Sequence, residues 1–212
     1  MPRVEPFEKF SAEYDEWFVR NRDVYQAEVD AIKDLIPSGK IGLEVGIGTG
    51  RFALPLGIKI GVEPSKRMTE IAKKRGLQVY QAVAEALPFK KESFDFILMV
   101  TTICFVDDLF KLFKEAYRVL KPKSFIVIGF VDRESELGKK YQLKREKSRF
   151  YKHAIFYSTE EVISILKELG FKVDIIRQTV FSKGKMDMIK DGYGEGSFVV
   201  IKASKKICME EK

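Results

Sequence analysis

Two acidic residues stand beside glycine- or proline-rich turns, where a ligand could reach both the carboxylates and the backbone. Glu44 precedes Gly46 by two positions in the run LEVGIGTG at 43–50. Glu63 follows Gly46 by 17 positions, in the run GVEPS at 61–65. Glycines let the backbone turn sharply and approach a ligand closely, and an acid at the end of the next strand can accept hydrogen bonds from two ribose hydroxyls. The two motifs together predict a nucleoside-binding site.

The spacing of the glycines separates the classes of nucleotide-binding loop. A dinucleotide fingerprint reads GxGxxG, but Arg51 stands where its third glycine would be, which disfavours a dinucleotide dehydrogenase. The Walker A pattern is absent because no Gly-Lys-Ser/Thr follows the loop. A carboxylate at Glu44 would repel a pyrophosphate. It suits a cationic ligand, such as one that carries an α-amino group and a sulfonium.

Alternating strands and helices are predicted to position the two motifs. Apolar runs predict strands at 41–45, 58–62, 77–83, 94–100, 125–131, 171–181 and 197–203, and helical patterns cover 65–75, 107–120 and 159–169. Strands that are apolar on both faces and alternate with helices indicate a parallel sheet covered on both sides. The last two strands lack a helix between them and must be antiparallel. We predict an α/β fold with a doubly wound, seven-stranded, mostly parallel sheet and an antiparallel C-terminal hairpin strand.

Two further segments lie outside the predicted sheet. Residues 1–36 form a helical cap, in which aromatic residues recur at helical spacing from Phe7 to Phe18 and a second helix begins near Asp23. The insertion 132–157 is polar, and its part 139–152 carries seven basic residues and one acidic residue, or +6 of the net +7. We predict one domain over 1–212, with this insertion as a basic lid.

Composition narrows the function classes. The longest apolar run has seven residues, far below the roughly 20 of a membrane span, and no secretory signal is recognisable at the N-terminus. Two distant cysteines suit a reducing, cytoplasmic compartment, and a single histidine leaves no zinc site, so we expect no metal. One asparagine among many charges of both signs is typical of a thermophilic source.

The motifs, taken in this order, resemble the class I S-adenosylmethionine-dependent methyltransferases, in the branch that acts mostly on small molecules. The resemblance spans nearly the whole chain. It continues through AEALPF at 84–89, SFDFI at 93–97, EAYRVLKP at 115–122, TEE at 159–161 and LGF at 169–171. It implies a Rossmann-like methyltransferase fold with the strand order 3-2-1-4-5-7-6, and S-adenosylmethionine as the cofactor.

The resemblance also implies where the cofactor binds. The glycine loop would surround the methionine part of the cofactor with Glu44, Gly46, Ile47 and Gly48, and Glu63 would bind its ribose. The adenine would lie beside Pro64, Ser65, Met68, Ala84 and Glu85. Met99 and Thr101 would border the reacting methyl group. The chain departs from the family pattern in three places, of which Lys123-Ser124, where a Gly-Gly turn is common, is interpreted as surface variation. Val83 stands where an Asp often reads the adenine amino group, and the short segment 50–58 with Pro55 predicts a first helix of only one or two turns.

Methyl transfer from a sulfonium mainly requires alignment of the reactants, which is worth about 7–11 kcal/mol. A general base is needed only when the acceptor must lose a proton early, so no catalytic residue need be visible. The polar and aromatic candidates for the substrate wall are Tyr14, Trp17, Phe105, Tyr151, His153 and Tyr157. Among them His153 is the single candidate for a base, because its unperturbed pKa lies near neutrality.

We therefore predict methyl transfer to an N, O or C atom of a small molecule, with an anionic acceptor among the options, by a monomer or homodimer without a membrane partner. One alternative is an RNA methyltransferase of the same fold, since aromatic residues interleave with the basic ones at 139–152. Against it, the charge is confined to that segment, and no Asn-Pro-Pro-Tyr motif follows the strand at 94–100. A catalytically silent cofactor-binding protein is the other alternative.

Overall fold

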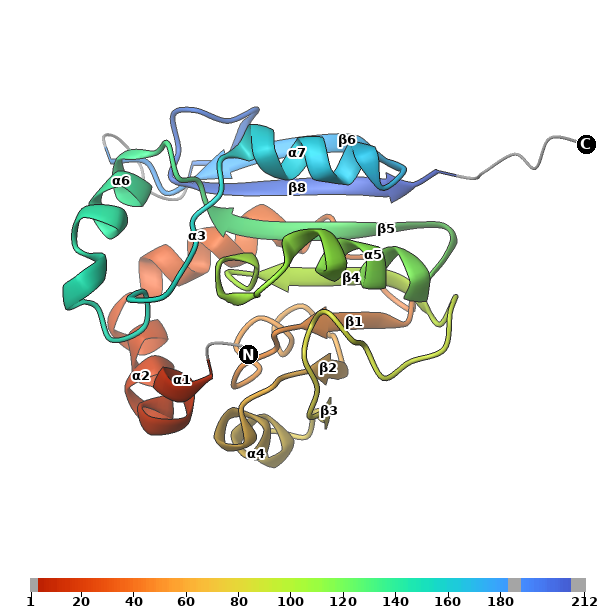
Figure 1. The fold of residues 1–212 in the computed structure, drawn as a ribbon, viewed down its shortest axis with the longest axis horizontal. Coiled ribbons are helices and arrows are strands. Elements are labelled where there is room, and N and C mark those ends of the chain that lie inside the picture. The colour runs from red at the N-terminus through yellow and green to blue at the C-terminus, as the bar shows by residue number, and fades with distance from the viewer. Residues whose placement is uncertain (1–3, 183–187, 207–212) are drawn as a thin grey trace, which may run out of the picture.

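The computed structural model describes residues 4–182 and 188–206 of the 212. Its centre is one sheet with the strand order β3-β2-β1-β4-β5-β8-β6-β7 (Figure 1). The strands are β1 (Gly42–Val45), β2 (Ile60–Val62), β3 (Gln78–Tyr80), β4 (Phe94–Val100), β5 (Leu120–Val131), β6 (Phe171–Thr179), β7 (Lys190–Asp191) and β8 (Phe198–Lys205). β1 to β5 run parallel to one another. β8 lies between β5 and β6 and is antiparallel to both. The predicted fold and order are confirmed, with one strand added.

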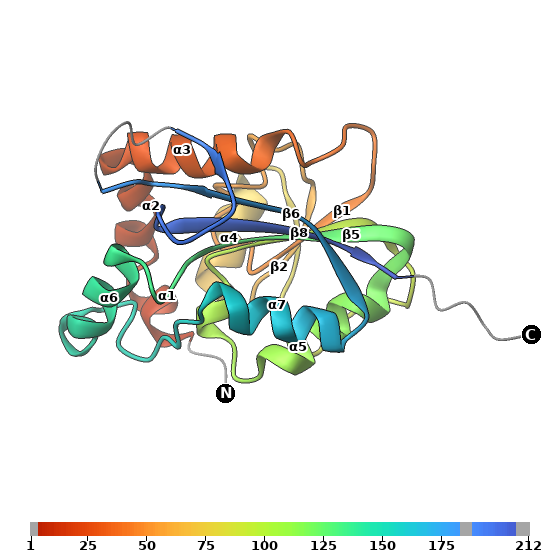
Figure 2. The same ribbon diagram turned by 90° about the horizontal axis from the view of Figure 1, so that it is seen from above.

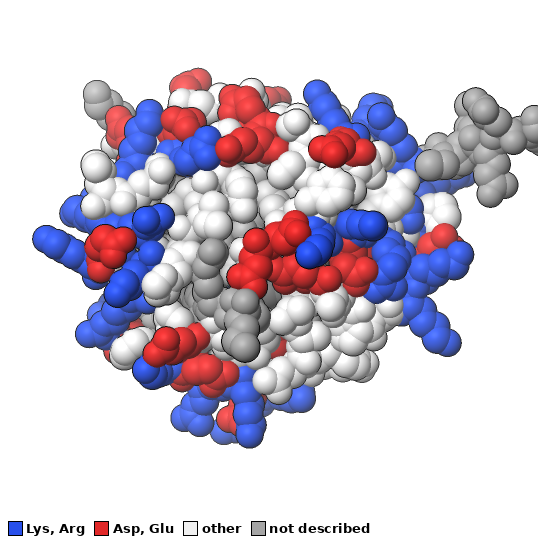
Figure 3. Space-filling view, in the orientation of Figure 1, with Lys and Arg blue, Asp and Glu red and all other residues white. Residues whose placement is uncertain are grey.

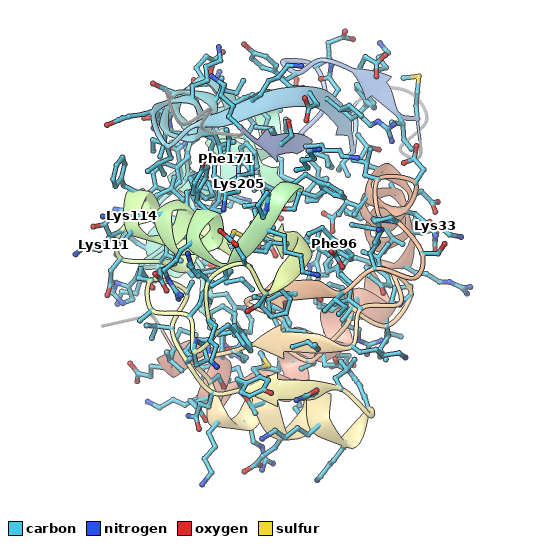
Figure 4. All side chains as sticks on the ribbon, turned by 90° about the vertical axis from the view of Figure 1, so that its right-hand side faces the viewer. Lys33, Phe96, Lys111, Lys114, Phe171 and Lys205 are labelled. Carbon is cyan, nitrogen blue, oxygen red and sulfur yellow. The ribbon has the colours of Figure 1, made fainter. Side chains whose placement is uncertain are left out.

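Helices cover both faces of the sheet (Figure 2). They are α1 (Glu5–Lys9), α2 (Ser11–Arg20), α3 (Arg22–Lys33), α4 (Lys66–Lys74), α5 (Leu109–Val119), α6 (Glu136–Leu143) and α7 (Thr159–Glu168), with 3₁₀ turns at Ile103–Phe105 and Arg145–Lys147. α5 and α7 share one buried apolar cluster with the sheet, and α2, α3 and α4 share the other. Figure 4 shows Phe171 on the side of α5 and Phe96 on the side of α3.

Side chains at the helix ends explain where several helices begin. Ser65 accepts a hydrogen bond from the Met68 N–H at 3.2 Å and caps α4, as predicted. Ser158 and Glu161 form a capping box at the start of α7, in which each side chain accepts from the other's backbone N–H. Such caps stabilise a helix by about 1 kcal/mol.

Three local predictions need correction. The N-terminal helix is broken at Phe10, which leaves the helical region (φ −123°, ψ 30°), and Asn21 rather than Asp23 precedes α3. Residues 51–57 form turns instead of a short helix, because Pro55 lacks an N–H and Gly57 adopts φ +73°. The added strand β7 is two polar residues on the edge of β6, too short to leave an apolar pattern.

Ionic contacts from α2 fasten the N-terminal helices to the glycine loop. Asp15 accepts hydrogen bonds from Thr49 Oγ1 (2.6 Å), Arg51 Nε (2.8 Å) and Arg75 Nη2 (2.7 Å). Burial alone would raise the pKa of Asp15, but the hydrogen bonds from Arg75, Arg51 and Thr49 hold that pKa well below its usual range. Arg51 therefore has a structural partner at the position where a dinucleotide loop has glycine.

We expect the substitution Asp15→Asn to lower the free energy of unfolding by about 2–3 kcal/mol. Removing the charge leaves two arginines, only 25% and 27% exposed, without their carboxylate. Glu16→Gln is the matched control, because Glu16 forms an exposed pair with Arg20 and should change stability by less than about 0.5 kcal/mol. Urea unfolding of both variants measures the difference, and equal effects would contradict this role of Asp15.

Candidate functional site

A cavity with about 660 Å³ of empty space lies at the carboxyl ends of β1, β2 and β4, beside α1 and α2; we call it the first cavity. In parallel sheets these strand ends, at a point where the strand order reverses, are the usual place for a ligand. Eight of the twelve residues predicted to bind the cofactor line it, namely Gly46, Gly48, Glu63, Pro64, Met68, Ala84, Glu85 and Thr101.

The other four predicted residues do not line the first cavity. Ile47 packs against Gly61, where an added Cβ would lie 2.3 Å from the Ile47 Cδ1 atom. Met99 is fully buried in the cluster beneath α5, and Ser65 caps α4. These three side chains lie in the layer behind the residues that line the cavity.

Glu44 is the fourth, and its side chain is 1% exposed. Burial raises its pKa well above the usual range, a hydrogen bond from the Ala53 backbone opposes that rise, and nearby Glu63 adds to it. Its Oε2 atom has no hydrogen-bond partner among the described residues. Burial thus favours the protonated form of Glu44, so its attraction for a cationic ligand is weaker than the sequence motif suggests.

Hydrogen bonds from its backbone N–H groups hold the glycine loop against the end of β2. The N–H groups of Gly46 and Ile47 donate to the Val62 carbonyl at 2.8 and 3.0 Å. Gly46 has φ +73°, a conformation that favours glycine, and an added Cβ would lie 2.4 Å from Thr102 Oγ1. A side chain at position 46 is therefore excluded twice, by the backbone conformation and by the neighbouring side chain.

Glu63 joins the loop to the start of α4. Its Oε2 atom accepts from the Gly48 N–H at 3.0 Å and its Oε1 atom from the Ser65 N–H at 2.9 Å. The residue is only 7% exposed, and burial raises its pKa to about 7, although the two hydrogen bonds oppose the rise. Each carboxylate oxygen can accept more than one hydrogen bond, so capacity remains for a ligand's hydroxyl groups.

A second cavity, with about 1300 Å³ of empty space, lies between the N-terminal helices and residues 132–157, which we call the lid segment. It shares Phe7, Tyr14, Thr101 and Phe105 with the first cavity. Four of the predicted substrate residues line it: Tyr14, Trp17, Phe105 and Tyr151. His153 is exposed and lines neither cavity, whereas Tyr157 lines a smaller third one near Cys104.

Thr101 lies where the three cavities meet and has an unusual backbone. It lines all three of them, and its φ is +50°, which is rare for a β-branched residue. Its N–H donates to the Gly129 carbonyl of β5 at 2.8 Å, which holds the strained turn in place. Strain of this kind concentrates at functional sites.

Aromatic contacts join the lid segment to other residues that line the second cavity. The ring of Phe150 lies 5.6 Å from that of Phe7, and Tyr151 stacks on Phe105 at 5.8 Å. Arg149 pairs with Glu13 of α2 at 2.5 Å. The seven basic residues of 139–152 are all exposed and line none of the three cavities. Figure 3 shows blue side chains projecting outward at the left edge, where α6 lies in Figure 1.

Glu28 is a functional candidate that the sequence prediction missed. It lies in α3, is 6% exposed and lines the second cavity. Burial raises its pKa to about 8. A signal was present, since Glu28 shares a helical face with Val24 and Ala31, four residues before and three after it, and an acid on an apolar face is unusual.

Among residues 4–182 and 188–206, no group of three or more His, Cys, Asp or Glu side chains could hold a metal ion. No helix in that same part of the chain has the length and hydrophobicity to cross a membrane.

Comparison with known proteins decides the family. A methyltransferase-domain family model matches residues 43–128. The crystal structure of an S-adenosylmethionine-dependent methyltransferase from Thermotoga maritima, described as a possible histamine N-methyltransferase, is similar with a TM-score of 0.91. The two chains are 52% identical over 96% of this chain and 100% of that one. This chain is a class I S-adenosylmethionine-dependent methyltransferase.

Two further relatives show how far the similarity extends. An uncharacterized protein of Methanocaldococcus jannaschii is 52% identical to this methyltransferase, over 94% of this chain and 98% of the relative. A demethylmenaquinone methyltransferase of Lactococcus lactis is 31% identical over 140 residues, which are 58% of this chain and 56% of the relative. Similarity to the first therefore extends over nearly the whole chain, whereas similarity to the second covers only part of it.

We expect Gly46→Ala to reduce both stability and cofactor binding, and Gly57→Ala to reduce stability alone. Both glycines have φ +73°, so an alanine at either costs about 1–2 kcal/mol of backbone strain. Only Gly46 has a neighbour, Thr102, within reach of the added Cβ, whereas the space around Gly57 is open. Urea unfolding and calorimetric titration with S-adenosylhomocysteine measure the two effects. Equal loss of affinity in both variants would contradict this assignment.

We also expect the ligand-free methyltransferase to lose stability as the pH rises from about 5 to 8. Burial holds the pKa of Glu63 at about 7 and that of Glu28 at about 8, above the roughly 4.3 of an unfolded chain. The folded state then binds more protons within this window, so its stability falls until the folded pKa is passed. Glu63 alone accounts for at most about 3 kcal/mol of this decrease in the free energy of unfolding. Thermal unfolding at pH 5 and pH 8 tests this, and a midpoint that is higher at pH 8 would contradict it.

Proposed function

We propose that this methyltransferase binds S-adenosylmethionine in the first cavity and transfers its methyl group to a small molecule in the second. The observation that carries the proposal is the junction of the two cavities, which share Phe7, Tyr14, Thr101 and Phe105. A cofactor and an acceptor placed on either side of this junction would meet without crossing bulk water.

The residues of the first cavity fit the cofactor. Glu63 keeps acceptor capacity for the ribose hydroxyls, and the bare backbone of Gly46 and Gly48 allows the methionine part to approach closely. Met68 and Ala84 offer an apolar surface for the adenine. Val83 does not line the cavity, so its lack of a polar side chain removes no contact there. Glu44, Ile47, Ser65 and Met99 support these groups from behind.

The chain's own contribution to the reaction is alignment and exclusion of water. S-adenosylmethionine supplies, when bound, a methyl group on a positively charged sulfur. Tyr14, Phe105 and the backbone turn at Thr101 form the passage between the cavities, and α1, α2 and the lid segment cover it. Holding two reactants in line can contribute about 7–11 kcal/mol without any proton transfer. The exposed position of His153 gives it no contact with this passage.

The second cavity supports a small, largely apolar acceptor. Aromatic rings form most of its lining, and among the described residues its only basic side chain is Arg20, which is exposed and pairs with Glu16 at 2.7 Å. An anionic acceptor or RNA would require basic groups in this cavity, yet those of 139–152 are exposed and do not line it. The names of the relatives from Thermotoga maritima and Lactococcus lactis, a possible histamine N-methyltransferase and a demethylmenaquinone methyltransferase, also point to small ring-containing acceptors.

The cofactor assignment is tested by thermal unfolding with S-adenosylhomocysteine, with NADH as the control ligand. A ligand at 100 times its dissociation constant adds about 2.7 kcal/mol, which raises the midpoint of a domain of this size by about 5–10 °C. We expect Glu63→Gln to weaken S-adenosylhomocysteine binding about 10- to 100-fold, since hydrogen bonds to a charged group are worth about 1.5–3 kcal/mol. Glu70→Gln, on the exposed face of α4, is the matched control.

No stabilisation by millimolar S-adenosylhomocysteine, or equal binding by Glu63→Gln and the wild type, would overturn the assignment. Turnover, followed as release of S-adenosylhomocysteine, is then measured with small molecules and with RNA at low and high salt. Methylation of a small molecule excludes a catalytically silent protein. Methylation of RNA alone, with a steep salt dependence, would overturn the acceptor class.

A further inference from the structure

We propose that the methyl acceptor carries a basic nitrogen and that Glu28 binds this nitrogen as the counter-ion of its ammonium form. The proposal rests on the second cavity being the acceptor site. It assigns the substrate class to small, ring-containing amines, and the recognition of the positive charge to one residue of α3.

The first observation is that the Glu28 side chain has no partner among the described residues. Its side chain is 6% exposed and lines the second cavity, and it makes no hydrogen bond or ion pair with any residue that the structure describes. A buried carboxyl group without a partner is costly, and such groups normally pair with a cation or with hydrogen-bond donors. The missing partner can be supplied by whatever occupies the cavity.

The second observation is the character of the surrounding wall. Aromatic side chains such as Trp17, Tyr14 and Tyr141 line the same cavity as Glu28. Aromatic faces attract cations, and an ammonium group between rings and a carboxylate is a common mode of amine recognition. An anion would meet no buried basic residue among the described residues of this cavity, because the cation of that lining, Arg20, is 70% exposed and paired with Glu16.

Among the titratable side chains that line the second cavity, Glu28 is the one whose pKa is raised into the neutral range; Glu63, with a pKa of about 7, lies in the adjoining first cavity. Burial raises the pKa values of Tyr14 from α2, Tyr25 from α3, Tyr141 from α6 and Tyr151 from the lid segment. At the rim, Glu13 pairs with Arg149 and Arg20 with Glu16. Glu28 itself has its pKa raised to about 8 by burial, so an ammonium ligand would have to displace its proton below that pH.

Matched probes test the proposal on the full chain saturated with S-adenosylhomocysteine. Calorimetric titration compares 2-phenylethylamine with 2-phenylethanol, which has nearly the same shape but no positive charge. We expect wild type to bind the amine at least 10-fold more tightly than the alcohol, and Glu28→Gln to lose this preference. Asp30→Asn, an exposed acid two residues further along α3, should keep it.

The pH dependence provides a second readout that needs no variant. The affinity for the amine should rise between pH 6 and about 8, as Glu28 loses its proton while the amine keeps its own, and the affinity for the alcohol should stay constant. If Glu28→Gln does not fold, this profile alone decides.

Three results would overturn the proposal: equal affinity of wild type for amine and alcohol, a preference that survives in Glu28→Gln, or an amine affinity that does not change with pH. Titration of the same proteins with S-adenosylhomocysteine, before they are saturated with it, separates the two proposals. Loss of cofactor binding counts against the proposed function, whereas intact cofactor binding without amine preference counts against the role of Glu28 alone.

Discussion

The site depends on one carboxylate that connects two backbone segments. Glu63, at the end of β2, accepts hydrogen bonds from Gly48 in the loop after β1 and from Ser65 at the start of α4. The parallel pairing of Val45 with Val62 brings these segments to the same edge of the sheet. Burial raises the pKa of Glu63 to about 7, so the carboxyl group that makes this connection changes protonation near neutral pH.

The second half of the site is built by segments outside the sheet. Asp15 fixes α2 on the glycine loop through Arg51 and Arg75, and the aromatic residues of α1 and α2 then meet those of the lid segment. The turn at Thr101 separates the two cavities and carries strained backbone geometry. The strained backbone of Thr101 and the Glu28 carboxyl group, which has no partner among the described residues, both raise the free energy of the folded chain. Both lie at the cavities, where a bound ligand can offset this.

Local patterns predicted the fold well because the central strands β4, β5 and β8 contain continuous apolar runs and Ser65 and Ser158 mark helix starts. The glycine loop and Glu63 were also legible from spacing. Motif spacing alone could not show that the Glu44 side chain is 1% exposed and absent from the lining of the first cavity, because burial depends on which elements cover β1. Glu28 was missed because recognising a buried face of α3 requires knowing what covers it, and the exposure of His153 depends on the path of the whole lid segment.

The central claim is that Glu63 and the glycine loop form the cofactor site and that the acceptor cavity adjoins it through Thr101. A crystal structure of the protein with S-adenosylhomocysteine tests this most directly. We predict that both ribose hydroxyls donate to the Glu63 carboxylate, that the adenine lies beside Met68 and Ala84, and that the sulfur faces the junction at Thr101. Ligand density elsewhere, or a ribose that makes no contact with Glu63, would contradict the account.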